Sequence, residues 1–225
     1  MDRDIREKAH KRLLEDIAID TRQTEIFTGR REISAPVMAV LARVPRHEFV
    51  LPEDDAVAYV NRPQGIGFGQ TISQPYIVAV MTDMLELGPD DVVLEIGTGS
   101  GYQAAVLALL CRRVFSIETI KPLAKSAAAR LKRLGYDNVD VRHGDGFLGW
   151  PEAGPFDAVI VTAAPERIPA RLCDQLKVGG RIIVPIGPVH GNQILKVGIK
   201  DKVGKMHFAS TLPVVFVPMV PGQNS

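Results

Sequence analysis

The sequence has few of the residues that build covalent or metal-bound scaffolds. Its 225 residues include two cysteines, Cys111 and Cys173, which form no C-x-x-C pair, so neither a disulfide framework nor a zinc site is expected. The five histidines include no His-Glu-x-x-His motif, so we interpret each as a surface or hydrogen-bonded side chain and expect no bound metal. They are His10, His47, His143, His190 and His207.

A long apolar run and an excess of one charge are also absent. No apolar stretch reaches about 18 residues and the chain begins with the charged Met-Asp-Arg-Asp-Ile-Arg, so we expect neither a membrane span nor a signal peptide. Lys and Arg total 27 against 26 Asp and Glu, and this balance indicates no nucleic-acid or membrane partner. We therefore expect a cytoplasmic protein that acts as a monomer.

The chain is organised around a strand, a glycine loop and a helix. Val92–Ile96 is an apolar run broken only by Glu95, as in a strand buried on both faces. Gly97, Gly99 and Gly101 follow, and an Ala- and Leu-rich run typical of a helix comes next. This unit opens a doubly wound α/β fold, in which ligands bind beyond the carboxyl ends of the strands.

The glycine pattern narrows the choice of ligand. No Gly-Lys-Ser/Thr follows, which excludes a P-loop, and Gly-x-Gly-x-Gly differs from the dinucleotide fingerprint Gly-x-Gly-x-x-Gly. With an acid two residues upstream, the loop resembles the first motif of Rossmann-like (class I) methyltransferases, which bind S-adenosylmethionine; a tight turn without a ligand is the alternative. The motif implies cofactor contacts from Glu95, Gly97, Thr98, Gly99, Ser100 and Gly101.

Strands and helices alternate after this unit. A strand over 113–117 ends in Glu118, at the position where an acid holds ribose hydroxyls in nucleotide-binding folds; a plain surface Glu is the alternative. A strand over 139–142 leads to Asp145 and Gly146, and Asp145 could accept from the adenine amine or merely form an Asp-Gly turn. The other predicted elements are strands over 156–162 and 181–185 and helices over 122–134 and 170–176, the last stopped by Gly179–Gly180.

The N-terminal region lacks this alternation. Helices are predicted over 4–20 and 33–41, the second entered through Ser34, so residues 1–60 are interpreted as a helical cap near the ligand cleft. Next, the glycines of 65–69 predict a flexible loop.

An apolar helix is expected after this loop. Ser73 is its predicted N-cap, with a contribution of about 1 kcal/mol, and Gly88–Pro89 is its predicted stop. The C-terminal region reads as strands without helices between them, over 193–199, 206–212 and 214–217, which predicts an antiparallel edge on a mainly parallel sheet. We expect a single domain over 1–225, divided into the cap 1–60, a cofactor-binding core 61–190 and antiparallel strands 191–225.

Several ordered motifs resemble those of protein-L-isoaspartate (D-aspartate) O-methyltransferases. The resemblance covers the chain from about Val44 to Pro218 and is far more specific than the glycine loop alone. The motifs are Val44-Pro45-Arg46, Phe68-Gly69-Gln70-Thr71-Ile72-Ser73-x-Pro75, Leu94-Glu95-Ile96-Gly97-Thr98-Gly99-Ser100-Gly101-Tyr102, Gly144-Asp145-Gly146, the Phe156-Asp157 strand ending in Thr162-Ala163-Ala164, and Val215-Phe216-Val217-Pro218.

This resemblance implies methyl transfer from S-adenosylmethionine to the free carboxylate of L-isoaspartyl or D-aspartyl residues in damaged proteins, with no metal. It implies Ser73 at the active site, orienting the accepting carboxylate. Thr71, Ile72 and Thr162 are expected to join the cofactor contacts already named. Substrate contacts are expected from Gln70, Ser73 and Val214, because the C-terminal edge could hold an extended peptide.

The reaction fits a chain without a catalytic triad or paired carboxylates. A sulfonium methyl is electrophilic and a carboxylate is already an ionised nucleophile, so positioning and exclusion of water are what remain to be supplied. The rivals are a nicotinamide oxidoreductase, a methyltransferase acting on a small molecule or nucleic acid, and a cofactor-binding module without turnover. The sequence lacks the dinucleotide fingerprint that a nicotinamide oxidoreductase would carry. A methyltransferase acting on base amines would favour Asp/Asn-Pro-Pro-aromatic at the position of Thr162-Ala163-Ala164-Pro165.

Overall fold

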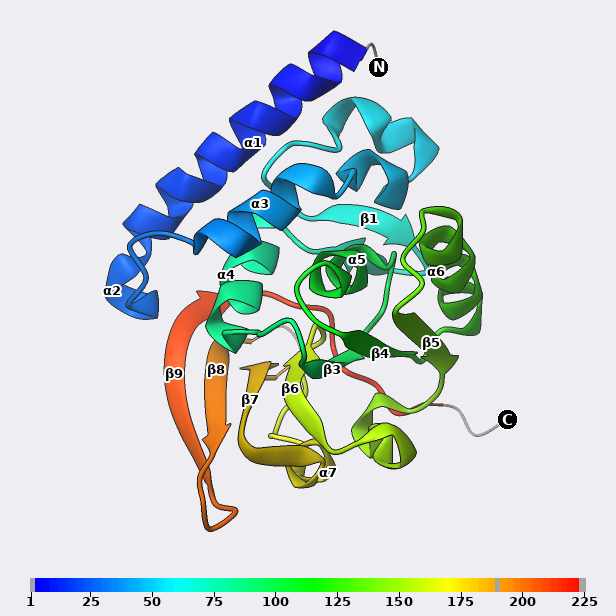
Figure 1. The fold of residues 1–225 in the computed structure, drawn as a ribbon. Helices are drawn as coiled ribbons and strands as arrows, with labels where there is room; N and C mark the ends of the chain where they lie inside the picture. The colour runs from blue at the N-terminus through cyan, green and yellow to red at the C-terminus, as the bar shows by residue number, and fades with distance from the viewer. Residues whose placement is uncertain (1–2, 189–190, 223–225) are drawn as a thin grey trace.

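The computed structural model describes residues 3–188 and 191–222, so His190 lies outside the described residues. Its centre is a seven-stranded sheet in the order β5-β4-β3-β6-β7-β8-β9, parallel from β5 to β7 and antiparallel at β8 and β9 (Figure 1). The strands are β3 (Val92–Ile96), β4 (Arg113–Glu118), β5 (Val139–His143), β6 (Phe156–Val161), β7 (Leu176–Ile186), β8 (Gln193–Lys200) and β9 (Met206–Val214). The expected doubly wound fold with an antiparallel C-terminal edge is confirmed.

The central strand β3 is buried along its whole length because apolar clusters cover both faces of the sheet. Val93 packs in one cluster with residues of the helices, while Leu94 and Ile96 pack in the other. This alternation follows from the two-residue period of a strand. The core helices are α4 (Pro75–Leu85), α5 (Tyr102–Ala108), α6 (Lys121–Arg133) and α7 (Ala170–Asp174).

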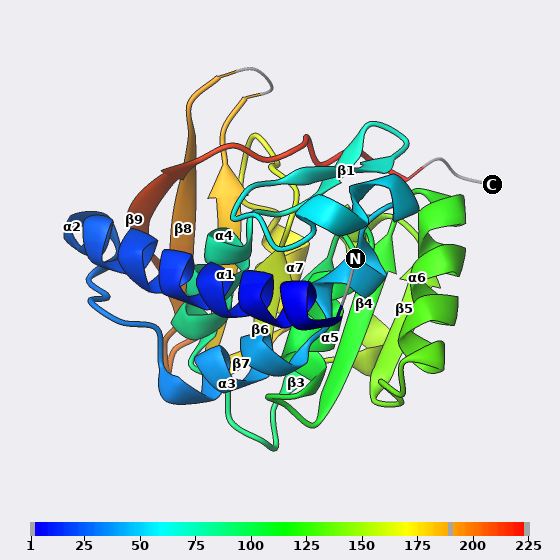
Figure 2. The same ribbon diagram turned by 90° about the horizontal axis from the view of Figure 1, so that it is seen from above.

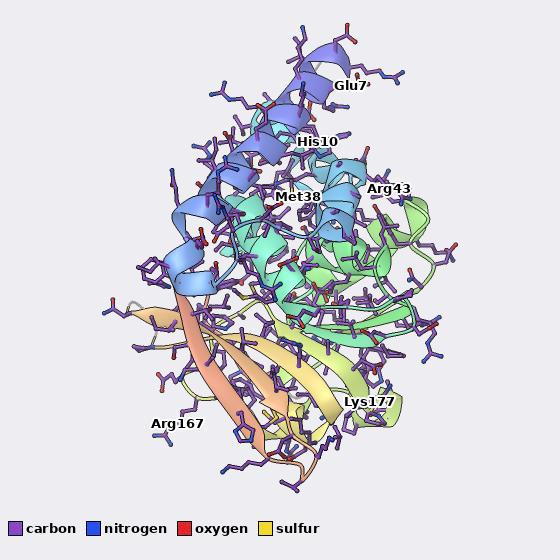
Figure 3. The ribbon with its side chains drawn as sticks, turned by 60° about the vertical axis from the view of Figure 1, so that its left-hand side comes forward. Glu7, His10, Met38, Arg43, Arg167 and Lys177 are labelled. Atoms are coloured by element: carbon purple, nitrogen blue, oxygen red, sulfur yellow. The ribbon has the colours of Figure 1, made fainter. Side chains whose placement is uncertain are left out.

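The N-terminal cap is helical, as expected. Its elements are α1 (Arg3–Gln23), α2 (Glu25–Thr28), α3 (Ala35–Arg43), η1 (Arg46–Phe49) and η2 (Pro52–Val57). Helix α1 lies over α3 and α4 (Figures 2 and 3), and its Leu13 and Ile17 are buried in the cluster that covers this face of the sheet. His10, labelled in Figure 3, links α1 to α3 through a 2.9 Å hydrogen bond between its ring and the Leu41 carbonyl.

The four described histidines each have a hydrogen-bond partner, as interpreted from the sequence. The partners are Leu41 O for His10, Tyr59 OH for His47, Thr119 O for His143 and a carboxylate oxygen of Asp201 for His207. Within the described part of the chain, no helix is both long and apolar enough to cross a membrane.

The glycine-rich segment over 65–69 is a β-hairpin, so the prediction of a flexible loop is wrong. β1 (Gln64–Gly67) pairs with β2 (Gln70–Ile72) in an antiparallel ladder. Its tip turns through three successive residues with positive φ, including Phe68 at 53°. Glycine on either side of Phe68 makes so tight a reversal possible, and the two-residue strand period was hidden by the glycines.

Two predicted helix boundaries at α4 are also wrong. The N-cap position belongs to Gln74, whose side chain makes no cap hydrogen bond; Asn61 Oδ1 instead accepts from Tyr76 N in the first turn at 3.0 Å. The helix ends at Leu85, where Glu86 adopts a left-handed φ of 53°, before the expected stop at Gly88–Pro89. Tertiary packing therefore sets both ends.

Two further boundaries differ near the C-terminal edge. Gly179 and Gly180 lie inside β7, which begins at Leu176, so they do not stop a helix. A Cβ on Gly180 would lie 2.9 Å from two backbone oxygens, which explains a glycine in this strand. Val214 closes β9, and 215–217 continue as an extended segment outside the sheet, so the predicted separate strand over 214–217 is wrong.

Candidate active site

Two adjoining clefts lie at the carboxyl ends of the parallel strands. The first lies between the glycine loop, the β1–β2 hairpin and the segment after β9, and the second lies beside β8 and β9. Thr71, Ser73, Thr162 and Val217 line both. The segment after β9 crosses from that edge of the sheet towards α6 (Figure 2), and so it can contribute to both clefts.

The floor of the first cleft is the glycine loop between β3 and α5. Gly97, Gly99 and Gly101 have φ of 96°, 53° and 89°, a region that favours glycine. A Cβ on Gly97 would lie 2.4 Å from Thr162 Oγ1, and that hydroxyl donates to Gly97 O at 2.7 Å. The loop therefore presents bare backbone to the cleft and has no room for a side chain at Gly97.

Glu118 closes one end of this floor. Its carboxylate accepts from Gly99 N at 2.8 Å and from Ile120 N at 2.9 Å, which joins the end of β4 to the glycine loop. It is buried yet lines the cleft. Because a carboxylate offers about four acceptor sites, Glu118 keeps capacity for a pair of ligand hydroxyls, such as those of a ribose.

Glu95 lies beneath the loop, outside the lining of the cleft. It is fully buried, and Ser116 Oγ donates to its carboxyl group while lying 2.6 Å from Thr98 Oγ1. Burial raises the pKa of Glu95 to about 8, an effect that Ser116 opposes and Glu118 reinforces. In this structure Glu95 therefore supports the loop through Ser116 and Thr98, and its direct contact with a cofactor stays a prediction.

Two other expected cofactor residues are also outside the lining. Gly101 faces α6, where an added Cβ would lie 3.2 Å from Leu131 Cδ1. Asp145 accepts from Phe147 N at 2.9 Å and caps the 3-10 turn η3 (Gly146–Leu148). Its neighbour Gly146 does line the cleft, and a Cβ there would lie 2.5 Å from Ile96 Cγ2.

Ser73 lies where the two clefts meet, between the end of β2 and the start of α4. Its carbonyl accepts from the buried Arg46 guanidinium at 2.9 Å. The hydroxyl is therefore on a segment whose backbone is fixed from the side of the cap. Neighbouring Thr71 lines both clefts, while Gln70 and Ile72 line the first only.

The second cleft is bounded by the end of the antiparallel edge, where Val214 lines it; its contact with substrate stays a prediction. The Gln193 side chain forms a two-way clamp on the segment after β9, donating to Phe216 O at 3.1 Å and accepting from Phe216 N at 2.6 Å. Further along, Val217 O accepts from Ala164 N at 2.8 Å. These bonds hold the segment in the wall between the clefts.

Sequence reasoning missed part of the lining of the first cleft. The missed residues include Tyr102, Gln103, Thr119, Ile120, Pro218, Met219 and Val220. Thr119 and Ile120 follow the end of β4 directly, so the rule that ligands bind at strand ends could have found them. Nothing in the sequence signals that Met219 and Val220 return to the glycine loop.

The arrangement can bind a nucleoside-like ligand beside an extended chain, with hydroxyl groups between them. The glycine loop and Glu118 are part of the lining of the first cleft, and Val214 is part of the lining of the second. Among residues 3–188 and 191–222, no group of three or more His, Cys, Asp or Glu side chains could hold a metal ion.

Comparison with known proteins was made for the whole chain. Residues 24–224 match the family model described as protein-L-isoaspartate(D-aspartate) O-methyltransferase. The protein-L-isoaspartate O-methyltransferase 2 of Syntrophobacter fumaroxidans is 54% identical over 95% of this chain and 87% of its own length. That of Polaromonas sp. is 51% identical over 92% of this chain and 98% of its own length.

Two solved structures are similar over nearly the whole chain. One, a protein-L-isoaspartate O-methyltransferase, has a TM-score of 0.78 and 27% identity over 93% of this chain and 66% of its own. The other, a Plasmodium falciparum protein of the same description in complex with S-adenosyl-L-homocysteine, has a TM-score of 0.77 and 25% identity over 94% of this chain and 98% of its own.

Proposed function

The chain belongs to the protein-L-isoaspartate(D-aspartate) O-methyltransferase family, and on this premise we propose that its two clefts form one active site. The enzyme moves a methyl group from S-adenosylmethionine to the free carboxylate of L-isoaspartyl, and D-aspartyl, residues in damaged proteins. In this proposal the first cleft takes the cofactor and the second takes the peptide. The observation that carries it is that Thr71, Ser73 and Thr162 line both clefts.

The residues of the first cleft fit the nucleoside and methionine parts of the cofactor. Glu118 has acceptor capacity left for the ribose hydroxyls, and Gly146 leaves a flat wall for the adenine. The glycine loop offers backbone to the methionine portion and has no side chain in the way. When bound, S-adenosylmethionine supplies a positively charged sulfonium with an electrophilic methyl group.

The protein's own contribution is orientation. A peptide carboxylate is ionised at neutral pH and needs no base, so a hydroxyl that holds it in line with the methyl group is sufficient. Ser73 is the hydroxyl proposed for this role, with Thr71 and Thr162 beside it. The rim around Val214 is proposed to hold the backbone of an extended peptide, which suits damage sites of varied sequence.

The test is transfer of labelled methyl from S-adenosylmethionine to two peptides that differ only in isoaspartate against normal aspartate. Base-labile label on the isoaspartyl peptide alone is the expected result. Cofactor binding with label on neither peptide would overturn the proposal and direct attention to small-molecule or nucleic-acid acceptors.

The cellular setting is also part of the proposal. Cys111 and Cys173 are buried and free, which suits a reducing compartment such as the cytoplasm. The shared sheet and continuous core of cap, core and C-terminal strands support a single domain, and we propose that it acts as a monomer. Gel filtration with light scattering would test the monomer, and a dimer at assay concentration would contradict it.

A further inference from the structure

Arg46 is a buried guanidinium at the junction between the cap and the active site. It opens η1, directly after Val44 and Pro45, and its relative exposure is 0%. The motif Val44-Pro45-Arg46 is part of the family resemblance, but neither cleft is lined by it. A charged side chain at such a depth needs a physical reason.

The contacts of Arg46 join three segments of the chain. Its Nε donates to Ala58 O at 3.0 Å, and its Nη2 donates to Ser73 O at 2.9 Å. The guanidinium also lies 4.8 Å from the ring centroid of Tyr102, the first residue of α5. One planar group thus connects the end of η2, the junction of the two clefts and the helix that follows the glycine loop.

This position is energetically expensive for a cation. Burial lowers the pKa of Arg46 to about 10, and the titratable groups that oppose this shift are the phenols of Tyr102 and Tyr59, not a carboxylate. The side chain therefore stays charged at neutral pH. An apolar side chain would avoid the desolvation cost, whereas a guanidinium can donate to two carbonyl groups in fixed directions.

A second set of contacts holds the residues that follow Ser73. Asp20 of α1 accepts from Gln74 Nε2 at 3.3 Å and from Asn61 Nδ2 at 2.9 Å. Asn61 Oδ1 in turn accepts from Tyr76 N at 3.0 Å. The cap therefore fixes the segment from Ser73 to Tyr76 at both of its ends.

We propose that Arg46 is a positioning residue for methyl transfer: it holds the Ser73 carbonyl and thereby fixes the Ser73 hydroxyl at the boundary between the clefts. The inference rests on the role proposed above for Ser73. Because a shift of about 1 Å in a reacting group can lower the rate by about 100-fold, loss of this hydrogen bond should be visible in turnover. Cofactor binding should change much less than turnover, because Arg46 reaches the first cleft only through the Ser73 carbonyl and the Tyr102 ring.

The experiment compares Arg46→Met, Arg46→Lys and the control Arg30→Met. Arg30 also joins the cap to the core, through Asp83 at 3.2 Å and Glu86 at 2.6 Å, but it lines neither proposed site. Each variant is assayed for kcat/KM with the isoaspartyl peptide, for affinity and stoichiometry of S-adenosyl-L-homocysteine binding, and for Tm.

Arg46→Met is expected to lower kcat/KM by about tenfold to 100-fold while S-adenosyl-L-homocysteine binds with full stoichiometry and with affinity changed by less than about threefold. Arg46→Lys should recover part of the loss, because it keeps a donor but cannot serve both carbonyls. Arg30→Met should lower Tm without lowering kcat/KM per binding site. If activity in Arg46→Met falls only in proportion to the S-adenosyl-L-homocysteine binding sites that are lost, as in Arg30→Met, the inference is overturned.

If Arg46→Met does not fold, Arg46→Lys decides: full activity in a folded protein overturns the inference, and a reduced kcat/KM with normal cofactor binding supports it. Combination with Ser73→Ala separates this inference from the proposal beneath it. If Arg46 acts through Ser73, the two losses are not additive. Fully additive losses overturn the role of Arg46 alone, whereas unchanged activity in the single Ser73→Ala variant overturns the role of Ser73 and, with it, this inference.

Discussion

The two clefts differ in how their walls are assembled. The floor of the first is one contiguous strand, loop and helix, joined by the end of β4 and its next two residues, and the β1–β2 hairpin and the segment after β9 complete its walls. The second is built from the start of α4, the two antiparallel strands and the segment after β9, which come from distant parts of the chain. The floor of the first cleft therefore depends on local backbone geometry, whereas the second cleft depends on how separate segments are held together.

Gly97→Ala is expected to give the largest effect, and it acts on the floor of the first cleft. The new Cβ would overlap Thr162 Oγ1 at 2.4 Å, at a φ of 96°. Backbone strain of about 1–3 kcal/mol together with this overlap should weaken S-adenosyl-L-homocysteine binding by roughly 100-fold in calorimetry. Gly88→Ala is the control, because its nearest neighbour is 3.8 Å away; affinity of Gly97→Ala within threefold of it would contradict the prediction.

Ser73→Ala tests the boundary between the clefts. Loss of a hydrogen bond to a charged carboxylate, worth about 1.5–3 kcal/mol, should lower kcat/KM for the isoaspartyl peptide by roughly tenfold to 100-fold. Binding of S-adenosyl-L-homocysteine should stay within about threefold. A loss of cofactor affinity as large as the loss of activity would show that the two clefts are not separable at this residue.

Val214→Asp tests the second cleft. It would put a carboxylate at a position that is 8% exposed on the peptide rim, and the peptide KM should rise by about tenfold, equivalent to about 1.4 kcal/mol. The matched control is Val203→Asp, the same change at a residue that is 88% exposed in the turn between β8 and β9. An unchanged peptide KM in Val214→Asp would remove this edge from the proposed peptide site.

Glu95→Gln tests the buried carboxyl group beneath the first cleft and is expected to have the smallest effect of the four variants. The pKa of Glu95 is raised from 4.5 to about 8, so the folded state holds a proton that the unfolded state loses. This group's contribution to the free energy of unfolding should therefore fall as pH rises from about 5 to 8 and level off above. Urea unfolding of Glu95→Gln should show a shallower fall over that range, by a few kcal/mol at most; equal slopes would contradict the prediction.

The same division explains what could be predicted from the sequence. β3 was located to the residue because a short apolar run followed by glycines is a local pattern. The placement of Glu118 in the cleft followed from spacing along two consecutive strands. These features depend on neighbours in the chain, and the sequence displays neighbours directly.

Features that depend on distant contacts were missed. The sequence predicts a loop where the β1–β2 hairpin lies, because its glycines hide the strand period. Antiparallel pairing of β1 with Gln70–Ile72 determines the observed structure. The sequence predicts Ser73 as the N-cap of α4, but Gln74 occupies that position. The Ser73 carbonyl instead accepts a hydrogen bond from Arg46. The Gln193 clamp on Phe216 joins residues 23 positions apart and has no sequence signature.

The segment held by that clamp has a consequence for how the enzyme is made. The strand and the helix that flank the glycine loop are translated before the C-terminal segment, and domains fold as they emerge from the ribosome. Val217 to Val220, which line the first cleft, emerge after every other residue of its lining. A nascent chain that has reached only β8 would therefore carry a glycine loop open on one side, and catalytic competence would wait until the segment after β9 has been made.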